Sequence, residues 1–383
     1  MVVQEVRVVP VQDGPERKQF LEFPYRLYRN NPHWVPPLRM DRKAMFDPKK
    51  FPFYEHSEAQ PFLALRGNQP VGTIAAILNN NHNKFHEEEA GFFGFFESVD
   101  DQEAADALLQ TATDWVRDKG MDVIRGPMNF STNEECGLLV DGFDSPPVVM
   151  MTYNPRYYVD LIEHAGFVKA QDLYAYWLAT SELVSQDGVV RSEKLARVVE
   201  KVRQRSGITV RKVNMKDFDH EVELIKRVYN SAWEKNWGFV PMTDAEFDHL
   251  AENLKMALDP NLVLIAEVDG EPVGFSLTLP DVNQALLGTG GRLVPAILRL
   301  LFYKLFKRFT ICRVIAMGVV EQHRMKGISA LFYYDTATNA APRGYAHAEM
   351  SWILESNLMM NRDIQFMGGK VYKTYRVYEK ALR

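Results

Sequence analysis

One stretch of the chain, residues 311–341, constrains the fold more than any other because it joins three different patterns. Residues 311–320 are mostly apolar and β-branched, which predicts a buried strand. Residues 321–329 are polar and basic and contain one glycine, Gly327. Ile328, Leu331 and Phe332 then recur on one face at helical spacing. The stretch therefore predicts a strand, a short turn and a helix.

The turn has the features of a phosphate-binding site. The first N–H groups of a helix have no intrahelical partner, and the helix dipole is positive at that end. A glycine lets the backbone approach an anion closely. We therefore expect a pyrophosphate-bearing ligand at residues 324–329. An ordinary strand–helix turn is the alternative, because short glycine motifs also arise by chance.

Length and composition narrow the class of protein. A chain of 383 residues is long enough for two domains or one large one. Its net charge of −5 gives no reason to expect nucleic acid as a partner. The two cysteines, Cys136 and Cys312, form neither a CxxC motif nor a Cys/His cluster, which fits a reducing cytoplasm. No run of about 18 apolar residues predicts a spanning helix, and the early charges argue against a signal peptide.

No metal site is expected either. His82 and His86 are four residues apart, as metal-binding histidines on one helix face can be. They lie in an asparagine-rich polar stretch, however, which we interpret as a solvated loop.

The order of predicted elements in the first half returns in the second. Residues 1–180 and 208–383 both read as strand, helix, helical or loop segment, three strands, helix, strand, helix and strand. Residues 181–207 lie between them, with a charged helix at 192–205 as the predicted linker. We predict an α/β protein with two tandem domains, each a mostly antiparallel mixed sheet flanked by helices.

The two halves differ at the turn that follows the third strand of the run. In the first half this turn carries Glu97, Asp100, Asp101 and Glu103, and it has no glycine. An acidic helix N-terminus of this kind would repel a phosphate. We therefore expect a single phosphate site, in the second half.

This arrangement resembles the GNAT superfamily of acyl-CoA-dependent N-acyltransferases. The family's pyrophosphate motif, Q/R-x-x-G-x-G/A, matches Arg324-Met325-Lys326-Gly327-Ile328-Ser329, with Ser329 in place of the last small residue. The segment ending in Asn357 and the strand Tyr375-Arg376-Val377-Tyr378-Glu379-Lys380 also match. The resemblance is strong over residues 260–383. Over residues 1–180 only the element order and the ending at Gly166-Phe167 match, so we expect a degenerate GNAT-like domain without an acyl-CoA site.

The resemblance implies acetyl-CoA or a longer acyl-CoA as co-substrate, without a metal. It places the pyrophosphate on the backbone of residues 324–329 and the oxyanion donor near Val319 or Val320. Asn357 would bind the pantetheine arm or order a water. Glu349 and Glu355 are candidate general bases, with Glu321 and His323 as further possibilities.

The position of the usual catalytic tyrosine holds Ile364 in this chain. Tyr372, Tyr375 and Tyr378 lie nearby in the sequence, and Tyr375 is included among the catalytic candidates. Because a thiolate is a good leaving group, with a pKa of about 8.5 for its conjugate acid, water could replace the tyrosine.

Two stretches bear on the acceptor. Trp233, Asn236, Trp237 and Phe239 follow the first helix of the second domain, where GNAT proteins place the acceptor pocket, and would suit a partly apolar acceptor with a polar head. A packed loop is the alternative. Residues 290–309 form a basic, amphipathic helix that could lie on a membrane or cover a long acyl chain. We favour its burial by docking against the domains.

Three classes of function follow. The first is transfer of an acyl group from acyl-CoA to an amine of a small molecule or amino-acid-like acceptor. The second is a Fem-type transferase that uses aminoacyl-tRNA, which the CoA-type turn disfavours. The third is a non-catalytic sensor or scaffold that binds acyl-CoA, which Ile364 keeps open. The protein would be a monomer or a homodimer.

Overall fold

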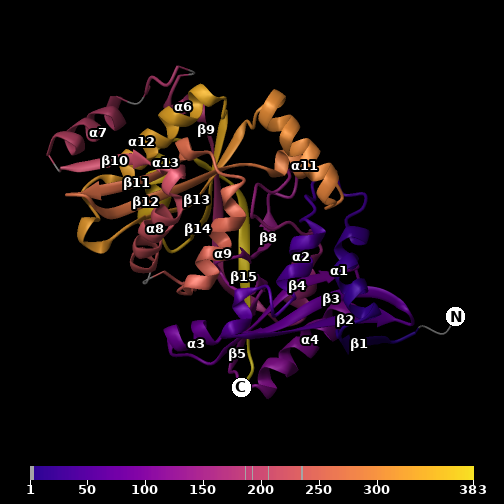
Figure 1. The fold of residues 1–383 in the computed structure, drawn as a ribbon. Helices are drawn as coiled ribbons and strands as arrows, with labels where there is room; N and C mark the ends of the chain where they lie inside the picture. Colours follow the sequence, from indigo (N-terminus) through magenta and orange to yellow (C-terminus); the bar gives the residue numbers. More distant parts are fainter. Residues whose placement is uncertain (1–3, 186, 192, 206, 234–235) are drawn as a thin grey trace. The chain divides into compact units, whose positions relative to one another are not determined.

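The computed structural model describes residues 4–185, 187–191, 193–205, 207–233 and 236–383. By its internal contacts the chain divides into two compact units (Figure 1). Unit 1 comprises Met1–Leu173, Leu286–Arg299 and Lys373–Arg383, and unit 2 comprises Tyr174–Ala285 and Leu300–Tyr372. Unit 1 thus includes the C-terminal residues of the chain, and unit 2 begins within the first half of the sequence.

Unit 1 is built on a mixed sheet in the order β1-β2-β3-β4-β5-β15, with β8 also paired to β15. Its strands are β1 (Val6–Pro10), β2 (Glu58–Arg66), β3 (Gln69–Leu78), β4 (Ala90–Ser98), β5 (Val123–Gly126), β6 (Met128–Asn129), β7 (Glu135–Cys136), β8 (Leu138–Asp141) and the end of β15 (Lys370–Ala381). Its helices are α1 (Pro15–Leu27), α2 (Arg39–Met45), the 3-10 turn η1 (Pro52–Glu55), α3 (Asn80–His86), α4 (Gln102–Asp118) and α5 (Tyr158–His164).

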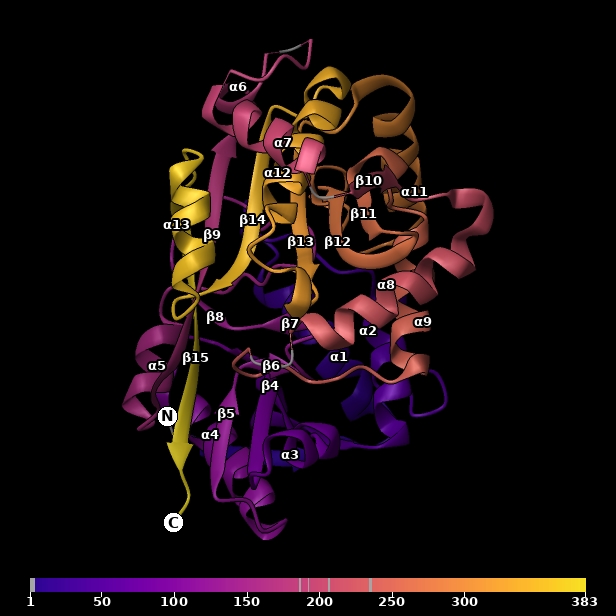
Figure 2. The same cartoon turned by 90° about the vertical axis from the view of Figure 1, so that its left-hand side faces the viewer.

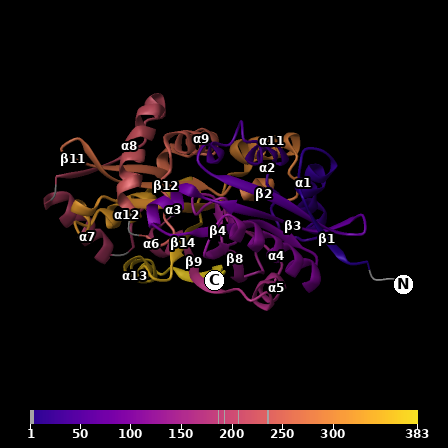
Figure 3. The same ribbon diagram turned by 90° about the horizontal axis from the view of Figure 1, so that it is seen from below.

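Helix α4 forms because it has a strong cap and a continuous apolar face. The Asp101 carboxylate accepts hydrogen bonds from the amides of Glu103 and Ala104 at 3.0 and 3.4 Å. Leu108, Leu109, Ala112 and Val116 then pack in the core of unit 1. Figure 3 shows α4 beside the strands β3 and β4. The close approach leaves no room for a side chain at Gly91, where a Cβ would lie 2.5 Å from the Val116 side chain.

Unit 2 repeats this plan in the order β9-β14-β13-β12-β11-β10. Its strands are the end of β9 (Val168–Ala179), β10 (Ile208–Lys212), β11 (Val263–Val268), β12 (Glu271–Pro280), β13 (Ile311–Val319) and β14 (His347–Leu354). Its helices are α6 (Thr180–Leu183), α7 (Glu193–Arg205), η2 (Met215–Asp217), α8 (Phe218–Ala232), α9 (Asp244–Lys255), η3 (Pro260–Leu262), α10 (Asn283–Leu286), the π-helical turn η4 (Tyr303–Lys307), η5 (Glu321–His323), α12 (Ile328–Ala340), η6 (Ala341–Arg343) and α13 (Leu358–Phe366). Helix α11 (Leu293–Phe302) belongs to unit 1 as far as Arg299 and to unit 2 from Leu300.

The sheet of unit 2 carries helices on both faces. On one face, Ile328, Leu331 and Phe332 of α12 pack with Val199 of α7 over the strands. On the other, the Trp233 ring lies 5.4 Å from the ring of Phe275. The predicted fold class, a mostly antiparallel mixed sheet flanked by helices, is confirmed in both units. The predicted linker helix corresponds to α7, although Ser192, its predicted first residue, lies outside the described residues.

A β-bulge interrupts the sheet at the same place in each unit. In unit 1, β4 pairs in parallel with β5 only as far as Phe92, and Phe95 then takes a left-handed conformation with φ 50°. In unit 2, β13 pairs with β14 only as far as Val314, and its register with β12 shifts at the next residue. Figure 2 shows β13 and β14 running side by side and then diverging. In each unit the parallel pairing thus ends before the bulge.

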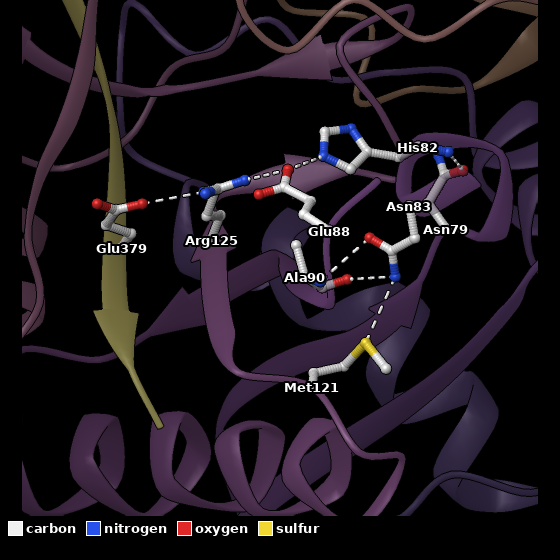
Figure 4. Close-up of polar contacts among 8 residues, drawn as sticks. All are labelled: Asn79, His82, Asn83, Glu88, Ala90, Met121, Arg125 and Glu379. Atoms are coloured by element: carbon white, nitrogen blue, oxygen red, sulfur yellow. Dashed lines mark hydrogen bonds and ion pairs between the residues drawn. The ribbon is translucent and has the colours of Figure 1, made fainter. Parts of the chain in front are cut away.

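The polar stretch around His82 is not the solvated loop that we expected. Residues 80–86 form α3, whose Asn79 cap accepts a hydrogen bond from the His82 amide, and the His82 side chain is buried. Its Nε2 lies 2.7 Å from Glu88, which Arg125 also contacts at 2.6 Å (Figure 4). Arg125 bonds in turn to Glu379 on β15 at 2.9 Å, so the network joins the last strand to β5.

This network stabilises unit 1 at neutral pH. The hydrogen bond from His82, with Arg125 beside it, lowers the pKa of Glu88 to about 2. The folded pKa lies below the unfolded value, so the stabilisation is present above about pH 5 and is lost as the pH falls toward 2. We predict that Glu88→Gln lowers the free energy of unfolding by about 1 kcal/mol at pH 7, and by less at pH 3.

Denaturant unfolding at both pH values, with the exposed neighbour variant Glu89→Gln as control, measures this effect. An equal loss at pH 7 and pH 3, or a loss as large in the control, would contradict the assignment.

Candidate active site

The predicted phosphate turn of unit 2 has the geometry of an anion cradle. Strand β13 ends at Val319, and α12 begins at Ile328 with Gly327 as its N-cap at φ 85°. In the described part of the chain, the amides of Gly327, Ile328 and Ser329 have no recorded acceptor. Three such amides at a helix N-terminus suit a phosphate group.

The turn also has a fixed backbone and an exposed basic rim. A Cβ at Gly327 would lie 2.4 Å from the Val202 side chain of α7, so this position accepts only glycine without rearrangement. Arg324 donates to the carbonyl oxygens of Val319 and Ala232 at 3.2 and 2.9 Å, which braces the turn. Met325 and Lys326 are exposed. The residues present therefore fit a diphosphate.

The predicted oxyanion donor lies at the diverging end of β13. The Val320 amide is already used, because it donates to the Val273 carbonyl at 2.9 Å. Along an extended strand, neighbouring amides point to opposite edges. The Val319 amide therefore points toward the side of β14, where pairing has ended. Of the two predicted donors, Val319 has the geometry for this role.

Glu349 is an internal anchor of unit 2. It is fully buried on β14 and accepts hydrogen bonds from the hydroxyls of Tyr372 and Ser351. The buried Arg313 donates to the Ser351 hydroxyl at 2.9 Å and lies 4.0 Å from Glu349. A carboxylate with these partners is well placed to hold Tyr372 and poorly placed to meet an incoming amine.

Glu355 and Asn357 follow β14 directly. The Asn357 side chain accepts a hydrogen bond from the Met360 amide at 3.2 Å and so caps α13. Its side-chain oxygen is therefore committed to the helix, and its amide nitrogen is the group left to face a ligand. Glu355 is partly exposed at the carboxyl end of the strand. It is the more accessible of the two predicted bases.

The structure does not bring all four catalytic candidates into one unit. Glu349, Glu355 and Asn357 belong to unit 2, whereas Tyr375 belongs to unit 1. There Tyr375 is fully buried and pairs with Leu139 of β8. Ile364, at the usual tyrosine position, is fully buried in the core of unit 2.

The predicted acceptor aromatics are divided between core and surface. Trp233 and Phe239 pack against Tyr229 with ring centroids 4.9 and 5.9 Å away. The Trp233 indole also covers Gly318, where a Cβ would lie only 2.4 Å from it. Asn236 and Trp237 remain partly exposed beside this cluster.

A cavity in unit 1 contains a carboxylate that we expected in the acidic turn before α4. Glu97 does not belong to the acidic turn before α4, because it lies on β4 beyond the bulge and lines a cavity of about 120 Å³. Its Oε2 accepts hydrogen bonds from the hydroxyls of Tyr28 and Tyr158, both at 2.7 Å. Loss of hydration on burial raises the pKa of Glu97 to about 7.

The other two charged side chains that line this cavity are paired with each other. Arg42 forms a bidentate ion pair with Glu135 at 2.9 and 3.0 Å, and Asn129 donates to the same carboxylate.

Two residues of the predicted acidic turn, Asp101 and Glu103, form ion pairs with Arg66 at 2.6 and 2.8 Å. The role of Glu97 could not be read from the sequence, because the two tyrosines that donate to it come from distant segments.

Comparisons with known proteins show the family to which this chain belongs. No family profile matches the chain. It is 38% identical to the protein named bacterial ceramide synthase from Caulobacter vibrioides, over 99% of this chain and 98% of that protein. It is 34% identical to the protein YghO of Escherichia coli K12, over 95% and 93% of the two chains. The chain belongs to the family of these two proteins.

Solved structures identify the fold of this family member. A tandem GNAT protein from the clavulanic acid biosynthesis pathway matches 98% of both chains with a TM-score of 0.57 and 11% identity. A conserved protein from Enterococcus faecalis V583, titled a probable N-acyltransferase, matches 98% of this chain and 73% of its own with a TM-score of 0.55 and 10% identity. The recognised fold, two tandem GNAT-like domains, is thereby confirmed.

Proposed function

We propose that this protein transfers an acyl group from acyl-CoA to the amine of a long-chain amino alcohol. The product would be an amide of the ceramide type. Nearly full-length similarity to a protein named ceramide synthase supports the acceptor class. The single structural observation that carries the proposal is the turn at 324–329, whose three unpartnered amides suit the diphosphate of CoA.

The described side chains suggest how such a transfer would run. The backbone of Gly327–Ser329 would hold the diphosphate, and acyl-CoA would supply an activated thioester in the gap between β13 and β14. The Val319 amide would donate a hydrogen bond to the thioester oxygen as negative charge develops there. An apolar cavity of about 40 Å³ beside this gap, lined by Val314, Met317 and Met350 among others, would accept apolar atoms of the acyl group.

Proton transfer would use the accessible carboxylate. The amine must be neutral to attack the thioester carbon, and Glu355 would accept the proton that it loses as the C–N bond forms. The C–S bond then breaks, and the thiolate leaves. A thiol has a pKa near 8.5, so the thiolate needs no dedicated acid and water can protonate it later. This chemistry tolerates Ile364 in place of tyrosine.

A non-catalytic acyl-CoA sensor remains the second candidate. It is favoured by Ile364, which is fully buried in the core and can supply no proton. The two candidates share the CoA site and differ only in whether free thiol appears.

The test uses Ser329, the second residue of α12. An aspartate there is favourable for the helix dipole, so Ser329→Asp should fold as stably as the wild type. It places a negative charge beside the diphosphate, so we predict that the affinity for acyl-CoA falls about tenfold or more. Calorimetric titration with acetyl-CoA and a long-chain acyl-CoA measures this.

Ser329→Ala is the matched control, because it keeps a small residue and adds no charge. We expect its affinity for acyl-CoA to remain within about twofold of the wild type. Equal affinities for the aspartate and alanine variants would refute the assigned turn. Absence of binding in the wild type would refute the transferase and the sensor together.

A further inference from the structure

The cavity of unit 1 has one polar group left for a ligand. Glu97 uses its Oε2 for the two tyrosyl hydroxyls, whereas no donor to its Oε1 is recorded among the described residues. Arg42 and Glu135 neutralise each other at the same cavity. When Glu97 is ionised, the side chains that line the cavity therefore carry one negative charge in excess.

The walls around this carboxylate are aromatic and aliphatic. The cavity is lined by Tyr25, Trp34, Phe96 and Leu138, among others, and the rings of Tyr28 and Trp34 stack at 4.8 Å. Aromatic faces attract a cation, and apolar walls favour an alkyl group. At about 120 Å³ the cavity is somewhat smaller than one of roughly 150 Å³ that holds benzene. It would therefore take a head group and the first carbons of a chain.

We infer that the unit 1 cavity is a binding site for a primary alkylamine. The ammonium would donate to Oε1 of Glu97, and the first carbons of the chain would lie against the aromatic walls. The inference that the natural ligand is a long-chain amino alcohol rests on the proposed function. The site itself follows from charge and shape, and it holds for any amine of this class.

The repeated plan of the two units supports a specialised role for this position. Thr73 pairs with Glu97 in unit 1, and Phe275 pairs with Gly318 at the corresponding place in unit 2. Tyr28, which ends α1 in unit 1, and Trp233, which ends α8 in unit 2, cover these two positions. In unit 2 the Trp233 indole occupies this position, whereas in unit 1 the Glu97 carboxylate lines a cavity there.

Calorimetric titration of the full chain with octylamine, octanol and octanoate tests the site, because these probes share a tail and differ in the charge of the head. We predict that octylamine binds about tenfold or more tightly than octanol, and that octanoate binds more weakly still. Glu97→Gln should bring the octylamine affinity down to that of octanol. The exposed variant Asp100→Asn should leave it unchanged.

The pH dependence gives a readout that needs no variant. The groups facing Glu97 are Tyr28, Tyr158, Arg42 and Glu135, and burial keeps the pKa of both tyrosines well above their usual value. Octylamine stays protonated, so its affinity should rise as Glu97 ionises between about pH 6 and pH 8.

Equal affinities for octylamine and octanol, or an affinity unaffected by Glu97→Gln, would overturn the site. This result is independent of the acyl-CoA titration, because the amine site is proposed in unit 1 and the acyl-CoA site in unit 2. Either site can be confirmed while the other is refuted.

An independent observation concerns the helix at 293–307. We expected its broad apolar face to be buried, but only Ala296 and Tyr303 are buried, with Leu300 partly so. The other large apolar side chains are exposed, with Leu305 71% and Phe306 76% accessible. The exposed set is Leu293, Val294, Ile297, Leu298, Leu301, Phe302, Leu305 and Phe306. We call these eight residues the apolar face; α11, which carries most of it, is labelled in Figures 1 and 2.

The charges around the apolar face are of one sign. Arg292, Arg299, Lys304, Lys307 and Arg308 flank it, and no acidic residue occurs between Asp281 and Glu321. The chain as a whole has a net charge of −5, so this local excess of positive charge is not general. A helix with exposed leucine and phenylalanine beside arginine and lysine suits the interface of an anionic bilayer.

We propose that the apolar face docks the protein on an anionic lipid surface. Phe302 and Phe306, whose rings lie 5.8 Å apart, would enter the boundary between headgroups and acyl chains. The basic residues would meet the lipid phosphates. No helix in the described part of the chain is long and apolar enough to cross a membrane, so the contact would be peripheral.

Co-sedimentation tests this with vesicles of phosphatidylcholine alone and of phosphatidylcholine mixed equally with phosphatidylglycerol. We predict binding to the anionic vesicles that weakens with salt. The double variant Leu305→Ser with Phe306→Ser should lose about tenfold or more in affinity. Val168→Ser with Val371→Ser, which changes two exposed valines elsewhere, should bind as the wild type does.

Failure of the wild type to bind anionic vesicles, or equal binding by the two double variants, would overturn the proposal. Light scattering tests the alternative that the apolar face pairs two copies of the chain. If the wild type is a dimer, the double variant Leu305→Ser with Phe306→Ser is a monomer, and neither binds vesicles, the lipid proposal is wrong.

Discussion

The separation of two parallel strands is the constraint on which both units depend. Parallel pairing stops at Phe92 in unit 1 and at Val314 in unit 2, and a bulge follows in each. A bulge leaves backbone groups unpaired and turns side chains away from the sheet. In unit 2, β13 continues to Val319 without pairing to β14 beyond Val314. In unit 1, the strand beyond the bulge carries the Glu97 carboxylate, which lines a cavity.

The same scaffold therefore carries different polar groups in the two units. In unit 2, glycine at 318 lets the Trp233 indole close against the strand, and the proposed diphosphate site lies in the backbone of the turn. In unit 1, Asp101 caps α4 and pairs with Arg66, so the corresponding turn is filled by an internal ion pair. The first unit has no glycine there, and its distinctive group is Glu97.

Local signals in the sequence were sufficient for most of the fold. The strand, the glycine turn and the helix at 311–341 were predictable because strand periodicity, turn chemistry and helix periodicity all act over a few residues. The repeated order of elements predicted two tandem domains of the confirmed fold. Within the site, the turn at Gly327 was predictable for the same reason, since its amides belong to consecutive residues.

The rest depended on contacts between distant residues. Glu97 looked like part of an acidic turn because its partners, Tyr28 and Tyr158, are far away in the sequence. His82 looked solvated because its partner Glu88 is anchored by Arg125, which belongs to another strand. The exposed face at 293–306 was misjudged because amphipathicity alone does not say what covers an apolar stripe.

The central claim is acyl transfer from CoA to a long-chain amine, and the most direct measurement is product analysis. The full chain would be incubated with palmitoyl-CoA and a long-chain 2-amino-1,3-diol, and the amide would be detected by mass spectrometry alongside free thiol. The account predicts equal amounts of amide and thiol, with both strongly reduced in Ser329→Asp and retained in Ser329→Ala. Tight binding of palmitoyl-CoA without amide or thiol, across acyl-CoAs from acetyl to palmitoyl, would contradict it.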